Sequence, residues 1–413
     1  MVRRIIVWLH RWTGLLLAGF LILEGLTGSV IAFYGDLERL VSPQYYATPK
    51  PGAPTLGAAT LAERAEALVP QAQDCVFDLR PDQFIASWCK PRDNPSTGKP
   101  YELGFTRLIL DPWTGAELAR LEHEDDLLRG PQALLPFIYG LHKRLALGPY
   151  GELTLGIIAL LWTLDCFAGF YLTLPVAIEH FWRRWKPSFL IKWPAGLYRL
   201  NFDLHRASGL WLWPALFIFA WSSVLFNLPS VYEPVNSAVF GRSSLLDQYM
   251  AIPQHPNDTP SLDWRAALAT GARLMKEQEA IYGFTFKQLR SIGYDHNKGI
   301  YSYGGVSSLD VDVEDGGQTF LVFDGDTGAL RRLFLPTGRN SADTVSLWLR
   351  ALHLADLRGS LAYRIFVCLL GLVIALLSAT GVYIWWKKRV ARKFSAEHRV
   401  EMVGVSRAEM AES

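Results

Sequence analysis

Four long apolar stretches interrupt the polar sequence and set its organisation. They cover Ile5 to Phe33, Leu153 to Pro175, Gly209 to Leu228 and Ala362 to Trp386. At a rise of about 1.5 Å per residue, each stretch is long enough to cross about 30 Å of hydrocarbon as a helix. The first stretch follows two arginines as in a signal peptide, but it is too long and lacks a small-residue cleavage site, so we expect a retained anchor. The pattern predicts four transmembrane helices.

Positive charge gathers at the ends of these stretches and predicts their orientation. Lys and Arg cluster before the first stretch, between the second and third, and after the fourth: Arg3, Arg4, Arg11; Arg183, Arg184, Lys186, Lys192, Arg199, Arg206; Lys387, Lys388, Arg389, Arg392, Lys393. By the positive-inside rule these three segments belong in the cytoplasm. We therefore expect a multi-pass protein of the bacterial inner membrane, with cytoplasmic termini and large periplasmic domains.

The two long polar segments share one order of local patterns. Thr60–Leu68 and Trp264–Glu279 have helical character, and alternating strand-like runs follow each helix. Each set of strands ends in an Asp-rich turn that closes on Thr-Gly, at residues 111–115 and 324–328. Two small periplasmic α+β domains are predicted. Cys75 and Cys89 fall on adjacent strands of the first, where an oxidising compartment permits a disulfide.

The chain is an internal duplication. Leu9-His10-Arg11 and Leu204-His205-Arg206 open spans in the two halves, and His142 and His353 precede the second and fourth spans. Each half is therefore a span, an outside domain and a span, with one shared orientation, so the pseudo-twofold axis should run along the membrane normal. The expected fold is an α-helical membrane protein with four transmembrane helices in a pseudo-twofold bundle plus two periplasmic α+β domains.

These patterns divide the chain into eight segments. Transmembrane helices are predicted at residues 1–35, 148–176, 205–228 and 357–388. The periplasmic domains occupy residues 36–147 and 229–356. A basic cytoplasmic loop covers residues 177–204, and a cytoplasmic tail covers residues 389–413.

Composition and missing motifs exclude several functions. Half of the residues are hydrophobic and 19% are charged, which is typical of a protein with both membrane and aqueous parts, and the net charge of +2 leaves no basic footprint for nucleic acid. The four cysteines form neither CxxC nor CxxCH, and the chain has no Gly-rich phosphate loop, HExxH or GxSxG. A redox cofactor must therefore be held by other residue types.

Histidine is the residue type that recurs in both halves. The repeat places His10 and His205 near the cytoplasmic face and His142 and His353 near the outer face, as two facing pairs. A bis-histidine haem needs one imidazole on each side of the macrocycle, which these pairs supply. A hydrated interfacial histidine is the alternative for each one taken singly, and His180 is a reserve cytoplasmic ligand.

Charged residues and glycines near these histidines suggest supporting roles. Arg11 and Arg206 are candidates for haem propionates inside, as are Lys143 and Arg144 outside, although anchoring and solvation explain them equally. Glu24 and Asp165 lie within spans, where each is either a proton relay or a buried hydrogen-bonding partner. Span glycines allow close approach of a flat macrocycle or of a neighbouring helix: Gly14, Gly28, Gly169, Gly209, Gly381.

Several segments resemble a known family. LHRWTGLLLAGF, LTGSVIAFYGDLE, FWRRW, DLHRASGL and SATGVYIWWKK are similar to the PepSY-associated transmembrane proteins, and the outside domains to PepSY modules. Within that family the architecture is similar to the FoxB-type siderophore reductases. The resemblance implies two haem b groups, with the four repeated histidines as ligands to haem iron, and reduction of ferric siderophore in the periplasm.

This resemblance implies a set of partners. The substrate would be a ferric siderophore, and the electron donor a quinol, a reduced flavin or a cytoplasmic reductase, since the chain lacks its own flavin or nicotinamide motif. The lipid bilayer surrounds the spans. No catalytic residue is identified, but Tyr139, Trp348 and Arg350 flank the outer histidines and are candidates for substrate contact.

Two other classes of function compete with this prediction. PepSY modules resemble inhibitory prodomains, so the chain could be a non-catalytic membrane-anchored regulator of a periplasmic protease. A small-molecule transporter also fits parallel repeats. The transporter is the weaker alternative, because we expect no broken helix and find few charges inside the spans.

Overall fold

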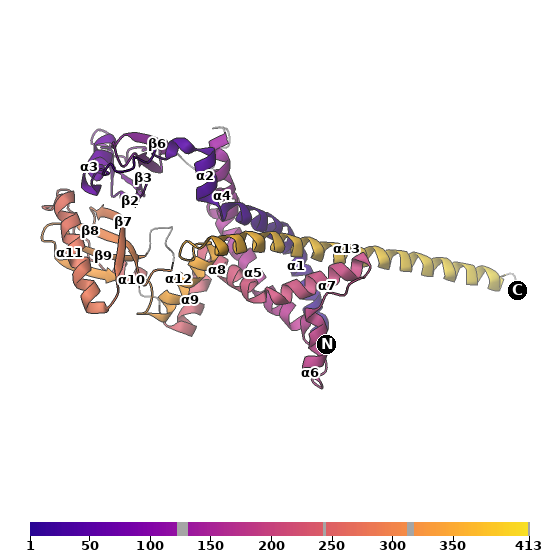
Figure 1. Cartoon of the computed structure of the whole chain (residues 1–413). Coiled ribbons are helices and arrows are strands. Elements are labelled where there is room, and N and C mark those ends of the chain that lie inside the picture. The colour runs from indigo at the N-terminus through magenta and orange to yellow at the C-terminus, as the bar shows by residue number, and fades with distance from the viewer. Residues whose placement is uncertain (122–130, 243–244, 312–317, 412–413) are drawn as a thin grey trace. The chain divides into compact units, whose positions relative to one another are not determined.

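The computed structural model describes residues 1–121, 131–242, 245–311 and 318–411 and divides into two compact units (Figure 1). The membrane unit contains Met1–Val30, His142–Leu228 and Phe366–Ser413. The sheet unit contains Ile31–Leu141 and Pro229–Ile365. The division follows the hydropathy pattern, because the apolar stretches fall in the first unit and the polar segments in the second.

Three helices of the membrane unit are long and apolar enough to cross a bilayer unbroken. These are α1 (Val2–Ile31), α5 (Pro149–Thr173) and the apolar part, Leu361–Ala391, of α13 (Leu361–Ala411). Their lengths exceed the roughly 20 residues that a span needs. The prediction of a multi-pass helical membrane protein is therefore confirmed.

The remaining apolar stretch is bent. It comprises α7 (Leu197–Trp211) and α8 (Trp213–Asn227), which meet at an angle of 70° and pass as a span only together. Pro214 lies in the first turn of α8, where proline lacks the N–H that a continuous helix needs and its ring clashes with the carbonyl of Leu210. The expectation of unbroken helices was therefore wrong for this span.

Close helix contacts in the membrane unit occur where side chains are smallest. A Cβ atom added to Gly25 of α1 would lie 2.4 Å from the carbonyl oxygen of Gly371 in α13. A Cβ atom on Gly156 of α5 would lie 2.8 Å from the carbonyl oxygen of Asn227 in α8. Since no Cβ tolerates such distances, glycine is required for α1 to pack on α13 and for α5 to pack on α8.

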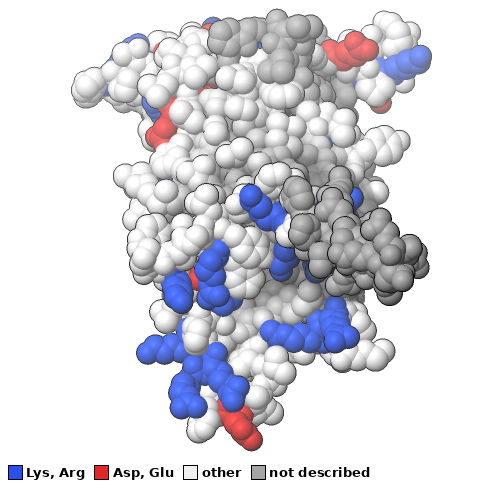
Figure 2. Space-filling view, turned by 90° about the vertical axis from the view of Figure 1, so that its right-hand side faces the viewer, with Lys and Arg blue, Asp and Glu red and all other residues white. Residues whose placement is uncertain are grey.

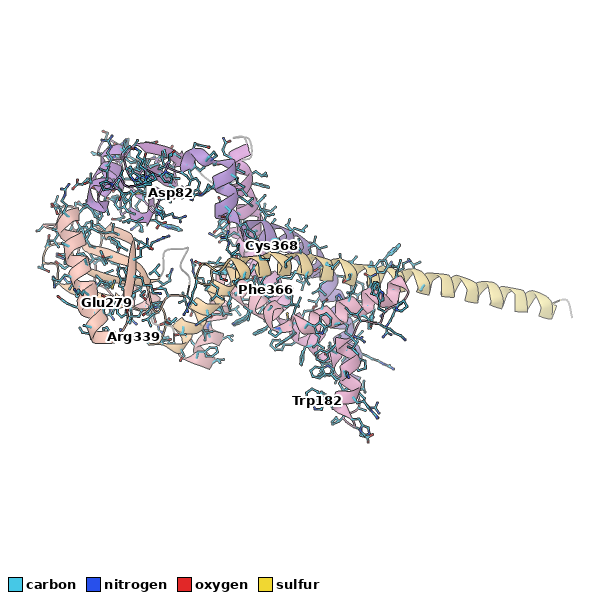
Figure 3. The ribbon with its side chains drawn as sticks, viewed as in Figure 1. Asp82, Trp182, Glu279, Arg339, Phe366 and Cys368 are labelled. Atoms are coloured by element: carbon cyan, nitrogen blue, oxygen red, sulfur yellow. A yellow bond between two sulfur atoms is a disulfide. The ribbon has the colours of Figure 1, made fainter. Side chains whose placement is uncertain are left out.

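The loop between α5 and α7 is a folded, aromatic and basic segment. It holds α6 (Phe181–Trp185) and a 3₁₀ turn (Lys186–Phe189), and the Trp185 indole N–H donates to the hydroxyl of Thr173 at the end of α5. Trp182 of α6 is 74% exposed (Figure 3). In Figure 2, Lys and Arg gather in the lower half of the view, at the height of α6. Exposed tryptophan beside cations is typical of a membrane–water boundary.

The sheet unit contains one eight-stranded antiparallel sheet built from both polar segments. The strand order is β10-β9-β8-β7-β2-β3-β5-β6, and β2 pairs with β7 at the centre. Each segment supplies four consecutive strands, so the sheet is symmetric about the β2–β7 pair. The strands are β2 (Val76–Arg80), β3 (Gln83–Ser87), β5 (Arg107–Leu110), β6 (Glu117–Leu121), β7 (Phe286–Asp295), β8 (Ile300–Ser307), β9 (Thr319–Asp324) and β10 (Leu330–Phe334).

Two equivalent helices cover one face of this sheet. They are α3 (Ala58–Leu68) and α11 (Trp264–Tyr282), which contact each other over the central strands (Figure 1). Alternate strand residues point into the core beneath them, as Phe77, Phe84 and Leu108 do. The duplication predicted from the turns is visible here, since Asp111 and Asp324 each accept backbone N–H bonds from the two residues that precede the turn glycine.

A disulfide joins Cys75 and Cys89, at the start of β2 and the end of β3. The sequence allowed a disulfide between these two cysteines, and the structure contains it.

The other elements of the sheet unit are short: α2 (Tyr34–Val41), α4 (Leu134–Arg144, of which His142–Arg144 belong to the membrane unit), α9 (Pro229–Phe240), α10 (Leu245–Met250), α12 (Ser341–His353), two 3₁₀ turns (Pro43–Tyr45, Pro131–Ala133) and the pair β1 (Ala72–Gln73) with β4 (Lys90–Pro91).

Candidate functional site

A cavity of about 450 Å³ lies inside the membrane unit, lined by α1, α5, α7, α8 and α13. Cofactor sites in proteins typically enclose roughly 300 to 1,000 Å³, so this volume is large enough for one. His10 and His205 both line it, with their ring centres 6.3 Å apart and their ring planes inclined by 54°. The structure thus brings together the two histidines predicted as the cytoplasmic pair.

The His10 ring is fixed by α5. Its Nδ1 atom lies 2.9 Å from Oδ1 of Asp165. One helical turn further along α5, a Cβ atom added to Gly169 would lie only 3.4 Å from Cε1 of the ring. The hydrogen bond sets the direction of the imidazole and the absence of a side chain at Gly169 leaves room for its edge.

The His205 ring is fixed by α13 in the same way. Its Nδ1 atom lies 3.1 Å from the carbonyl oxygen of Leu377 and 3.3 Å from the hydroxyl of Thr380. A Cβ atom added to Gly381 would lie 3.3 Å from Cε1 of the ring. Each histidine of this pair is therefore held by the second span of its own repeat through its Nδ1 atom, so Nε2 is the nitrogen that could bind a metal.

The spacing of the two rings fits a shared metal ion. Two imidazoles that bind one metal from opposite sides, each with a bond of about 2.0 Å, have ring centres roughly 6 Å apart. The measured 6.3 Å agrees with that value. Two further glycines, Gly14 and Gly209, also line the cavity, so a flat group can approach the helix backbones. The residues present therefore fit a haem held by His10 and His205.

Four cations line the same cavity. Two of them, Arg11 and Arg206, were predicted from the sequence, whereas Arg3 and Lys388 were not. Because neither Arg3 nor Lys388 has a basic counterpart in the other repeat, the symmetry that identified the histidines gave no signal for them. A cavity with several cations at its edge suits a group that carries carboxylates.

Arg206 is already partly neutralised. Its Nη2 atom donates to Oδ1 of the fully buried Asp203 and to the carbonyl oxygens of Pro187 and Leu190. Its Nε atom is buried and has no hydrogen-bond partner among the residues that the structure describes. The sequence predicted that Arg206 binds a haem propionate. Because Nη2 is already bonded to Asp203 and two carbonyl oxygens, only the other nitrogens of the guanidinium are available for that role.

A third histidine repeats the local arrangement. The Nδ1 atom of His142, on α4, lies 3.0 Å from both the Thr27 hydroxyl and Oε2 of Glu24 on α1. A Cβ atom on Gly28 would lie 3.0 Å from Cε1 of this ring. Both span carboxylates, Glu24 and Asp165, thus contact a histidine. The second oxygen of Glu24, Oε1, is buried without a hydrogen-bond partner.

The other predicted residues lie elsewhere. His353, Trp348 and Arg350 are on α12 in the sheet unit, whereas His142 belongs to the membrane unit. Tyr139 packs edge-to-face on Tyr34 within the sheet unit. Lys143, Arg144 and His180 belong to the membrane unit, but they are not among the residues that line its cavity: Lys143 and Arg144 end α4, and His180 is exposed before α6.

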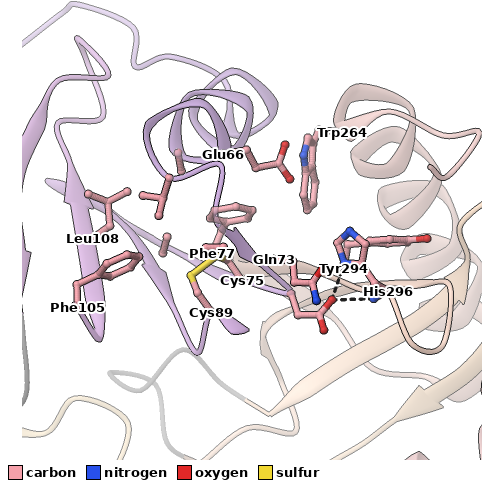
Figure 4. A pocket seen from close by; sticks show the side chains of 15 residues that line it. Glu66, Gln73, Cys75, Phe77, Cys89, Phe105, Leu108, Trp264, Tyr294 and His296 are labelled. Carbon is pink, nitrogen blue, oxygen red and sulfur yellow. Dashed lines mark hydrogen bonds and ion pairs between the residues drawn. A yellow bond between two sulfur atoms is a disulfide. The ribbon is translucent and has the colours of Figure 1, made fainter. Parts of the chain in front are cut away.

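A small second cavity lies in the sheet unit, between the two halves (Figure 4). Its volume is about 20 Å³, enough for about one water molecule. Asp74 accepts bonds from the backbone N–H and the ring of His296 and from Lys90, and these bonds lower the pKa of its carboxyl to about 2 although burial acts in the opposite direction. The carboxylate holds β2 to β7, and this cavity is too small for a substrate.

Comparison with models of protein families identifies the family of the chain. The model of the PepSY-associated TM region matches residues 7–388, which is nearly the whole chain. The matched residues include His10, Asp165, His205 and Gly381 at the cavity. No curated protein matches the chain.

Proposed function

Because the chain belongs to the family of PepSY-associated TM regions, we propose that it is an inner-membrane haem b protein that moves electrons across the membrane to reduce ferric siderophore. The observation that carries the proposal is the pair of imidazoles, His10 and His205, at 6.3 Å in a cavity of about 450 Å³. An ordinary helix contact does not need two histidines with fixed Nδ1 atoms facing one cavity.

In this function the residues at the cavity bind and orient the cofactor. A haem b supplies a one-electron carrier when bound. His10 and His205 would hold the group through their ring nitrogens, and Gly169 and Gly381 leave room for the two rings. Asp165 and the Leu377 carbonyl accept from Nδ1 of the two rings, so that Nε2 of each ring would be the nitrogen that binds iron. Arg3, Arg11 and Lys388, which line the cavity, would neutralise the carboxylates of the group.

A second haem b completes the proposal, with His142 and His353 as its ligands. This half of the proposal is supported by the repeat, which makes His353 the counterpart of His142. It is also supported by the clamp around His142, where Thr27 and Glu24 meet Nδ1 and Gly28 leaves space at the ring edge. Two carriers would give an electron a path across the membrane.

The reaction balances with a donor on the cytoplasmic side. Each ferric ion accepts one electron and is released as ferrous ion, because the hard oxygen donors of a siderophore favour the trivalent ion. A quinol or a reduced flavin gives up two electrons and two protons and so serves two ferric ions. By the positive-inside rule, the cations near α6 support a cytoplasmic position for that loop and a periplasmic position for the polar segments of the chain. Tyr139, Trp348 and Arg350 remain the candidates for substrate contact.

Spectroscopy of the purified full chain tests the proposal. We expect a Soret band and a pyridine haemochrome of type b at about two haems per chain. Under anaerobic conditions the dithionite-reduced protein should reoxidise faster with ferric siderophore than with the gallium complex of the same siderophore, because gallium cannot be reduced under these conditions. A protein without haem would contradict the whole proposal and favour the protease regulator. Haem with equal reoxidation rates would contradict the substrate.

A further inference from the structure

The three clamped histidines share one construction on the helix that faces them. A glycine lies beside Cε1 of each ring, and the residue four positions earlier in the same helix offers an oxygen to Nδ1. Four residues is just over one helical turn, so both groups lie on the same face of the helix. The glycine and acceptor pairs are Gly169 with Asp165, Gly381 with Leu377, and Gly28 with Glu24.

The two rings that share the cavity differ in the charge of their acceptor. His10 faces the carboxyl side chain of Asp165, whereas His205 faces the neutral backbone carbonyl of Leu377. Asp165 and Leu377 are equivalent positions of the duplication, since Gly169 and Gly381 follow each by four residues. Equivalent positions of the two repeats therefore present a charged acceptor to one ring and a neutral acceptor to the other.

Asp165 is committed to His10. Its side chain is only 12% exposed, and among the described residues its ion pair is with His10. Two of the four cations that line the cavity bond elsewhere: Arg3 donates to the carbonyl oxygens of Leu172 and Leu174, and Arg206 donates to Asp203. The hydrogen bond of Asp165 to Nδ1 therefore acts most directly on the His10 imidazole.

A carboxylate on Nδ1 changes the chemistry of the opposite nitrogen. It attracts the Nδ1 proton, which makes the ring more electron-rich and Nε2 a stronger donor to a metal. A stronger donor favours the higher oxidation state of iron and lowers the reduction potential. A backbone carbonyl has this effect to a smaller extent because it carries no net charge.

We propose that Asp165 is the positioning residue that sets the reduction potential of the group held between His10 and His205. This inference rests on the proposed function, since it requires a haem in the cavity. Asp165 holds His10 as the electron-rich ligand, and His205 remains an ordinary imidazole. The iron there then gives up its electron more readily than it would between two histidines bonded only to carbonyls.

Redox titration of Asp165 variants in the full chain tests this assignment. Asp165→Asn keeps the shape and an acceptor oxygen but removes the charge, so we expect the haem to be retained and its potential to rise by about 59 mV, which is roughly a tenfold change in the one-electron equilibrium. Asp165→Glu retains the carboxylate and should bring the potential back towards that of the unchanged protein. Asp165→Leu, the residue of the second repeat, should also raise it.

Thr163→Val is the matched control on the same helix. It removes a buried hydroxyl that donates to the carbonyl oxygen of Ala159 and is not among the residues that line the cavity, so the potential should stay close to that of the unchanged protein. Retained haem with an unaltered potential in Asp165→Asn overturns the inference and leaves the proposed function standing. Absence of haem from the unchanged protein overturns both. If Asp165→Asn does not fold, the comparison of Asp165→Glu with Asp165→Leu decides.

Discussion

The two repeats meet inside both units, but they meet differently. In the sheet unit, β2 pairs with β7 and α3 contacts α11, and the cavity left between the halves is about 20 Å³. In the membrane unit, the histidines of the two halves face each other across a cavity of about 450 Å³. Duplication alone therefore does not determine whether side chains fill the junction between the two repeats or a cavity remains there.

The side chains at the two junctions explain the difference. Trp264 packs edge-to-face on both Phe77 and Tyr301, with ring centres 5.3 and 5.2 Å apart, so aromatic groups fill the sheet junction. At the membrane junction, glycines lie beside the rings of His10 and His205, so no side chain fills the space there. A cavity kept open by glycines and bordered by fixed histidines is what a bound group requires, whereas the filled junction serves stability.

Removing a histidine of the membrane-unit cavity should lower the haem content more than any other substitution. If His10 and His205 hold one of two haems as proposed, His10→Ala and His205→Ala should each lose about half of the total haem. The pyridine haemochrome content per chain is the measurement. His255→Ala, which changes an exposed loop histidine of the sheet unit, is the control. Full haem content in both cavity variants would contradict the assignment.

Replacing the glycines beside the two rings with larger residues should have the next largest effect on haem content. In Gly169→Val and Gly381→Val the new side chain would lie against rings whose Cε1 atoms are 3.4 and 3.3 Å from an ideal Cβ. We expect haem content to fall several-fold, within the roughly 10- to 100-fold range of affinity lost when groups supporting metal ligands are altered. Gly19→Val in α1, where nothing lies within 4 Å of the added Cβ, is the matched control and should keep its haem.

A substitution at the filled junction of the sheet unit should lower the free energy of unfolding and leave the haem content unchanged. Trp264 is 8% exposed, so Trp264→Ala should destabilise the sheet unit by about 3 to 5 kcal/mol and leave the haem content unchanged. Denaturant unfolding monitored by limited proteolysis measures the first quantity. Trp88→Ala, at a tryptophan that is 81% exposed, should change little. Equal destabilisation by the two substitutions would show that the junction is not the stabilising feature.

Low pH should gradually reduce the stability of the junction between the two halves of the sheet unit. The pKa of Asp74 is lowered from 3.8 to about 2 in the folded protein, so its contribution is complete above the unfolded pKa and is lost as pH falls from about 4 to 2. Asp74→Asn should remove this pH dependence and cost on the order of 1 to 2 kcal/mol near neutral pH. Unfolding midpoints between pH 2 and 7 measure it. A parallel pH profile in the variant would exclude Asp74 as its source.

The sequence alone determined the spans, the duplication and the cavity histidines. Hydropathy over about 20 residues is a local property, and so it can be read without knowing any contact. The motifs around His10 and His205 repeat in order along the chain, which identified the pair before any distance was known. The alternation of apolar and polar residues predicted adjacent strands near Cys75 and Cys89, which the structure joins by a disulfide.

Only the tertiary structure decided which groups surround those histidines. Asp165 is 155 residues from His10, and Leu377 is 172 residues from His205 and contributes a backbone oxygen that no side-chain pattern can reveal. The pairing of β2 with β7 and the cavity positions of Arg3 and Lys388 are likewise results of packing. A chain encodes its elements through neighbouring residues, but a site is formed by residues that meet only when those elements pack.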